Sequence, residues 1–139
     1  MGHGARSALA FVSLLQHARI DLLVDVRAYP ASRRNPQFAR DALSRSLATA
    51  GIAYDWQGAA LGGMRPQGYL AHMETHEFQR AGASLISMGA ERRVCMMCAE
   101  IDPADCHRSH ISDWLVGQGE RVLHVIAENQ TREHAARLF

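Results

Sequence analysis

A continuous apolar run, Val94-Cys95-Met96-Met97-Cys98-Ala99, constrains the fold of this chain more than any other stretch. A strand that is exposed on one face alternates apolar and polar residues, so this run predicts a strand buried on both faces. Such a strand belongs at the centre of a sheet that helices cover on both sides. The chain then crosses Asp102 and Pro103 and resumes a helical pattern at Asp105, whose carboxylate can cap a helix.

The rest of the chain alternates between strand-like and helix-like stretches, without a repeat or a linker. This alternation predicts one α/β domain over residues 1–139, a three-layer fold whose mostly parallel sheet has about four strands flanked by helices. A short helix is expected from Thr131 to the end. The other predicted strands are residues 21–27, 52–56 and 121–126, and the other helices are residues 8–17, 36–50, 69–91 with a break near Glu74, and a helix that begins at Asp105.

Composition narrows the class of protein. A net charge of +1 gives no support for wholesale binding to nucleic acid or to a membrane surface. No apolar run is long enough to span a bilayer, and the amino terminus lacks the pattern of a secretion signal, so we expect a cytoplasmic protein. Three cysteines in a reducing compartment are expected to be free thiols.

Cys106 is the first candidate for chemistry. In the first turn of the predicted helix, its thiol would feel the positive end of the helix dipole, and His107 and Arg108 would add positive charge. These effects favour a thiolate, which is a nucleophile. The alternative is a half-buried cysteine whose sulfur only packs, and the sequence leaves both interpretations open.

Cys98 is the second candidate. Cys95 and Cys98 have a C-x-x-C spacing, but residues three apart on a strand face opposite sides of the sheet, so Cys95 is interpreted as core. A zinc site would need Cys98, Cys106, His107 and Glu100 to converge, and we expect no metal and no other cofactor. A reversible disulfide between Cys98 and Cys106 is a further alternative.

Several charged residues fall at strand ends or in loops that would share one rim of the sheet. Guanidinium groups bind phosphate or carboxylate at two points, so together they would form an anion clamp. The acidic residues at strand ends, Asp25 and Glu100, would act as general bases or pair with arginines. The histidines His72 and His76 are interpreted as an exposed pair rather than metal ligands. The candidate clamp residues are Arg27, Arg33, Arg34, Arg65 and Arg108.

A set of motifs, in order along nearly the whole chain, resembles the bacterial family known as domain of unknown function 488. The most specific is Cys98-Ala-Glu followed by Pro103 and Cys106-His-Arg. The resemblance implies a compact α/β domain but no established reaction. It implies a polar pocket formed by Asp25, Arg27, Arg34, Cys98, Glu100, Cys106, His107 and Arg108. The other motifs are Asp25-Val-Arg, Ser32-Arg-Arg-Asn-Pro-Gln-Phe, Ala50-Gly-Ile-Ala-Tyr, Leu61-Gly-Gly and Gly68-Tyr.

The amino terminus departs from this family. Its members usually open with a strand that ends in a Gly-His-Ser turn, whereas here Gly2-His3-Gly4 directly follows Met1. We therefore expect that strand to be missing from this sequence or to start upstream, which leaves an exposed sheet edge.

Together these features favour a small cytoplasmic enzyme that acts on an anionic, nucleotide-like substrate. Cys98 or Cys106 would be the reactive thiol, His107 and Glu100 would transfer protons, and the arginines would hold the anion. The alternative is a module that binds or senses a small ligand, a metal or nucleic acid without turnover. The sequence therefore leaves open whether the protein is an enzyme, and it indicates no membrane partner. It leaves the oligomeric state open as well.

Overall fold

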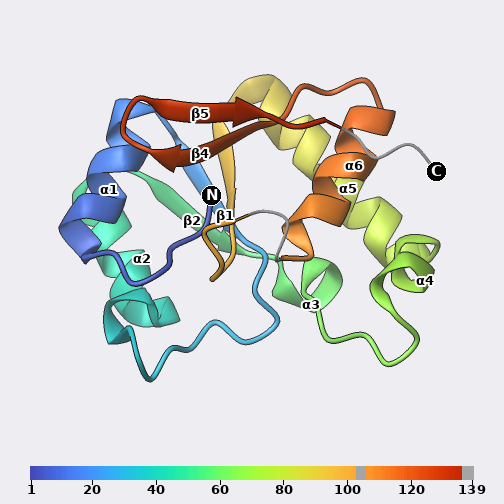
Figure 1. Cartoon of the computed structure of the whole chain (residues 1–139), viewed down its shortest axis with the longest axis horizontal. Helices are drawn as coiled ribbons and strands as arrows, with labels where there is room; N and C mark the ends of the chain where they lie inside the picture. The colour runs from blue at the N-terminus through green and yellow to red at the C-terminus, as the bar shows by residue number, and fades with distance from the viewer. Residues whose placement is uncertain (103–105, 136–139) are drawn as a thin grey trace.

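The computed structural model describes residues 1–102 and 106–135, and its centre is a parallel sheet (Figure 1). Three strands form it in the order β2-β1-β3, with β1 (Leu22–Asp25) in the middle, β2 (Ala53–Trp56) on one side and β3 (Val94–Met97) on the other. Asp25 lies opposite Trp56 and Met97, so all three strands end at the same edge. The predicted α/β fold class is confirmed.

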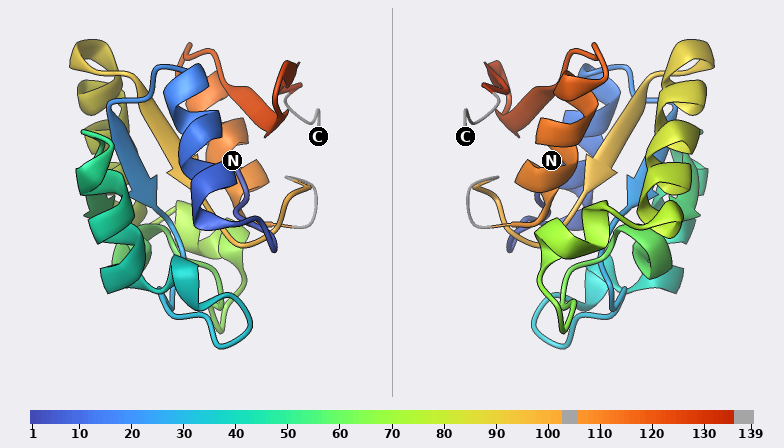
Figure 2. Two further views of the ribbon diagram at one scale, coloured as in Figure 1. Left: turned by 90° about the vertical axis from the view of Figure 1, so that its left-hand side faces the viewer. Right: turned by 90° about the vertical axis from the view of Figure 1, so that its right-hand side faces the viewer.

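Helices cover both faces of this sheet, as the alternating pattern predicted, and they enclose the strands in the two views of Figure 2. One face buries Phe11 and Leu47 from the helices α1 (Ala8–His17) and α2 (Arg40–Thr49). The other face buries side chains from α5 (His76–Glu91) and α6 (Arg108–Gly117). The short helices are η1 (Pro36–Phe38), α3 (Gly58–Leu61) and α4 (Tyr69–Met73).

Local signals set several helix ends. The Ser7 hydroxyl accepts a hydrogen bond from the Ala10 N–H and caps α1, and Thr75 caps α5 in the same way through Phe78. Thr75 separates α4 from α5, so the predicted break near Glu74 is confirmed. Gly51, at φ +75°, ends α2 in the left-handed conformation that glycine adopts without strain.

The carboxy-terminal part corrects two predictions. Residues 121–126 do contain a strand, β4 (Leu123–Ala127), but it pairs antiparallel with β5 (Gln130–Glu133) in a separate hairpin, drawn in dark red in Figure 1. The helix expected from Thr131 is therefore wrong. Asn129, at φ +58°, makes the tight turn that reverses the chain. The preference of this turn for a hairpin is stronger than the helical preference of the residues that follow it.

The amino terminus lies beside β3. Gly2 forms a parallel bridge with Cys98: the Cys98 N–H donates to the Met1 carbonyl at 3.2 Å, and the Cys98 carbonyl accepts from the His3 N–H at 2.9 Å. The Met1 ammonium group donates to the Met96 carbonyl at 2.7 Å. The first half of β3 has no such neighbour in the described chain and lines a cavity of about 640 Å³.

Within the described ranges, no helix combines the length and apolar character that crossing a membrane requires.

Candidate functional site

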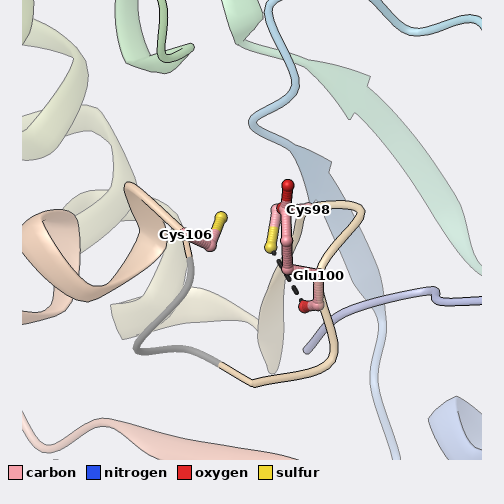
Figure 3. Close-up of side chains that lie close together, drawn as sticks. All are labelled: Cys98, Glu100 and Cys106. Carbon is pink, nitrogen blue, oxygen red and sulfur yellow. Dashed lines mark hydrogen bonds between the residues drawn. The ribbon is translucent and has the colours of Figure 1, made fainter.

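The candidate site lies where β1 and β3 end. Cys98 and Glu100 follow β3, and Cys106 and His107 come directly before α6. Figure 3 shows the side chains of Cys98 and Cys106 facing each other, with Glu100 beside Cys98. The predicted helix start at Asp105 lies outside the described residues. The helix itself begins at Arg108, so Cys106 and His107 precede its first turn rather than fill it.

The two sulfurs and one carboxylate form a compact cluster. The Sγ atoms of Cys98 and Cys106 and a carboxylate oxygen of Glu100 all lie within 4.8 Å of one another. Both cysteines are free thiols and are buried, at 1% and 7% exposure, whereas Glu100 is exposed. Glu100 therefore lies on the solvent side of the cluster. Cys95 packs in the core on the other face of the sheet, as the strand periodicity predicted.

The two thiols differ in acidity. A hydrogen bond from the Cys106 thiol lowers the pKa of Cys98, and the positive charge of Arg108 lowers it further, while burial opposes both effects. The same hydrogen bond, together with burial, raises the pKa of Cys106. A Cys98 thiol would instead donate to the Glu100 main-chain oxygen, at 3.4 Å. Of the two sulfurs, Cys98 is therefore the one whose surroundings favour the thiolate, while those of Cys106 favour the thiol.

His107 has one defined tautomer. Its Nε2 lies 2.8 Å from the Val26 carbonyl, which only accepts, so Nε2 carries the proton. Nδ1 then presents its lone pair to Cys106 Sγ, at 3.6 Å. Burial lowers the pKa of His107, which favours this neutral form. The ring passes close to the chain at Gly63, where a Cβ would lie only 3.2 Å from Nδ1.

Arg108 is a buried cation with few partners. It is 1% exposed, and its Nη2 donates to the Ile101 carbonyl at 3.2 Å. Nε and Nη1 have no hydrogen-bond partner within residues 1–102 and 106–135. Because an uncompensated buried charge is costly, this guanidinium favours negative charge beside it. The Cys98 sulfur is one such neighbour.

Asp25 and Arg27 pair with each other. Arg27 donates from Nε and Nη2 to the two carboxylate oxygens of Asp25, and both side chains are buried. Pairing with an arginine was one of the two roles that the sequence left open for Asp25. The pair lies at the same end of the sheet as the sulfurs, because Val26, between its two members, accepts the bond from His107.

The other predicted clamp arginines differ from Arg108 in their surroundings. Arg33 and Arg34 are exposed in the loop after β1. Arg65 donates to the main-chain oxygens of Gly62 and Ala59 and so supports the end of α3.

The histidines His72 and His76 are not an exposed pair. His76 is exposed, but His72 is buried, and its Nε2 bonds to the Ala60 carbonyl. Since they belong to α4 and α5, respectively, their spacing in the sequence does not place them on one helix face.

Two residues of this region had no predicted role. Tyr54 donates from its hydroxyl to Asp25, and burial raises the pKa of this tyrosine. His3 is buried and stacks on Phe38, and its Nε2 lies 3.5 Å from Arg27 Nη1. Both residues occur in the family-like motifs, which was the only signal that could have identified them.

Comparison with known proteins finds one family. The family described as "Domain of unknown function DUF488" matches residues 7–115, a range that contains β1 to β3 and the whole cluster from Cys98 to Arg108. No curated protein and no solved structure matches the chain.

Proposed function

This chain belongs to the DUF488 family, and from the chemistry of its site we propose that it is a small thiol-dependent enzyme that acts on an anionic, nucleotide-like substrate. The observation that carries the proposal is the Arg108 guanidinium, which is buried, has two nitrogens, Nε and Nη1, without a partner in the described chain, and acts with its charge on the Cys98 sulfur. A fixed buried cation stabilises a thiolate and attracts an anion.

In this proposal Cys98 is the nucleophile. Its thiolate forms a bond to an electrophilic centre of the substrate, and the bond from that centre to the leaving group breaks. The leaving group takes the proton of the Cys106 thiol. Water then cleaves the bond to sulfur, adds its hydroxyl group to the substrate fragment and returns a proton to Cys106, so that the starting state is restored.

His107 and Glu100 transfer protons in this scheme. Nδ1 of His107 accepts the Cys106 proton when the leaving group does not need it, since the two atoms are 3.6 Å apart. Glu100 lies on the solvent side of the cluster and is the group through which protons exchange with water.

The anion is held mainly by Arg108, because Asp25 already neutralises Arg27 and main-chain oxygens occupy Arg65. The exposed Arg33 and Arg34 attract the substrate from solution. We place this chemistry in the bacterial cytoplasm, where the reducing environment keeps the thiols free.

Alkylation of the intact protein tests the proposal. With iodoacetamide at neutral pH and mass spectrometry of each cysteine peptide, we expect Cys98 to react at least about 10-fold faster than Cys95, which is buried in β3 and is a control in the same molecule. Replacing Cys106 with alanine removes the hydrogen-bond donor and should slow this reaction. A nucleoside monophosphate should slow it as well. Three cysteines that react slowly and alike would refute the enzyme and favour the binding module.

A further inference from the structure

We infer that the cluster of Cys98, Glu100 and Cys106 is also a binding site for a soft divalent cation of the zinc class, and that the bound cation switches the proposed thiol chemistry off. The switching depends on the proposed function, whereas the binding stands on the geometry alone. The cluster joins the end of β3 to the start of α6, so its ligands come from two separate elements.

The three ligand atoms are nearly at coordination spacing. Zinc binds thiolate sulfur at about 2.3 Å and carboxylate oxygen at about 2.0–2.2 Å, so the ligand atoms of a tetrahedral site lie roughly 3.5–3.8 Å apart. In the cluster these atoms all lie within 4.8 Å of one another. A contraction of about 1 Å, within the reach of side-chain rotation, would therefore complete three corners of the tetrahedron.

His107 is the candidate for the fourth corner: its ring lies beside Cys106 but outside the group of three ligand atoms, so it would have to move towards Cys98 and Glu100 on binding. Its Nε2–H is fixed on the Val26 carbonyl, which is the usual second contact of a metal-binding histidine. The free Nδ1 lies 3.6 Å from Cys106 Sγ, within the range expected for two ligand atoms on one zinc ion. No proton has to leave this nitrogen before it binds.

Charge balance also favours a divalent cation. Two thiolates and one carboxylate carry three negative charges, so a divalent cation leaves one negative charge on the site. Arg108, buried nearby with Nε and Nη1 unpartnered in the described residues, neutralises that charge. Thiolate ligands select zinc-like cations over magnesium or calcium, which prefer oxygen.

Binding has a direct effect on reactivity. The lone pair of Cys98 that would attack a substrate becomes the lone pair that binds the cation. The Cys106 thiol must lose its proton to bind and can no longer supply it. The enzyme would therefore be active only when the cation has been removed.

Zinc titration of the whole chain tests binding. The protein is stripped with a chelator, reduced, and titrated with Zn²⁺ against a chromophoric chelator. We expect one ion per chain, at least about 100-fold weaker binding in Cys98→Ser and in Cys106→Ser, and unchanged binding in Cys95→Ser. Co²⁺ in place of zinc should give sulfur-to-metal charge-transfer bands that both cluster variants lose. Equal binding by all three variants, or absence of binding to the parent chain, would overturn the inference.

A second measurement separates this inference from the proposed function. Alkylation of Cys98 is followed with and without one equivalent of Zn²⁺, and circular dichroism checks that each variant is folded. Zinc that binds and slows alkylation supports the switch, whereas zinc that binds without slowing it overturns the switch. A metal-free Cys98 that reacts no faster than Cys95 contradicts the proposed enzyme, while the titration still decides the metal site.

Discussion

The Asp25 carboxylate holds the Arg27 guanidinium by two hydrogen bonds, 2.9 Å from Nε and 2.7 Å from Nη2, although only one residue separates them in the chain. The Tyr54 hydroxyl donates to the same carboxylate from the neighbouring strand. The end of β1 is thus closed by a buried ion pair. Asp25 neutralises the positive charge of Arg27, so Arg27 does not add to the positive charge that could bind an anionic substrate.

Replacing Asp25 with asparagine should leave Arg27 as an uncompensated buried cation. We expect the free energy of unfolding to fall by about 3–5 kcal/mol, measured by urea denaturation. Tyr54→Phe is the matched control, because it removes one hydrogen bond to the same carboxylate and should cost only about 1 kcal/mol. A loss below about 1 kcal/mol in Asp25→Asn would show that the pair is not structural.

Replacing Arg108 with methionine should show separately what its positive charge and what its buried volume contribute. The long apolar side chain fills similar space, so we expect the free energy of unfolding to change by less than about 2 kcal/mol. Alkylation of Cys98 at neutral pH should slow by at least about 10-fold, because the thiolate loses the positive charge of Arg108. The exposed Arg33→Met is the control and should leave the rate unchanged. An unaltered rate in Arg108→Met would remove the main support for the proposed function.

His124 should make the stability depend on pH. It bonds to His134, which bonds to Asp113 on α6, so this chain of contacts fastens the hairpin. Burial lowers the pKa of His124 to about 4, from an ordinary value of 6.5. Between pH 6.5 and pH 4, His124 binds a proton in the unfolded chain but stays neutral in the folded chain. The free energy of unfolding therefore falls as the pH drops towards 4. Lesser causes of the lowered pKa are the charges of Arg108, the Met1 ammonium group, His134 and Arg132.

Urea denaturation between pH 7 and pH 4 measures this effect. We expect His124 to contribute a loss of at most about 3 kcal/mol across that interval. In His124→Phe this contribution should disappear, so the variant should show a flatter pH profile than the parent chain. Equal pH profiles for the two proteins would contradict the prediction.

Gly58 should tolerate no side chain. A Cβ there would lie 1.9 Å from the Arg27 carbonyl and 2.3 Å from the Trp56 Nε1 that donates to this carbonyl. Gly58→Ala should therefore destabilise the fold by about 1–3 kcal/mol, measured by thermal unfolding. Gly89, inside α5, is the control, because a Cβ at that position would meet nothing within 4 Å. Gly89→Ala should stabilise the chain by about 0.5–1 kcal/mol, and a destabilising result would contradict this.

Regular patterns in the sequence predicted most of the fold. Leu22–Asp25 is buried at every position, as a strand covered on both faces must be, and Ser7 and Thr75 cap helices with their own hydroxyls. The hairpin was mispredicted because Gln130–Glu133 is exposed throughout and lacks the apolar alternation that identifies a strand. The turn at Asn129 is what makes this segment run back along β4 as an antiparallel strand.

The sequence left open whether Cys98 and Cys106 meet, because their distance depends on how the loop between them folds. Their sulfurs lie within 4.8 Å of each other. That Arg27 is neutralised while Arg108 is not could not be predicted, because it depends on which carboxylate each guanidinium reaches in three dimensions. The tautomer of His107 depends likewise on a contact with Val26, far away in the sequence.

The bridge between Gly2 and Cys98 joins the main chain that carries the Cys98 sulfur to residues 1–3. Because Met1 and His3 hold the main chain of Cys98 on its N–H and its carbonyl, a shift of those first residues by one position would move the sulfur with it. The position of the Cys98 sulfur is therefore set by main-chain bonds to a segment more than 90 residues away in the sequence.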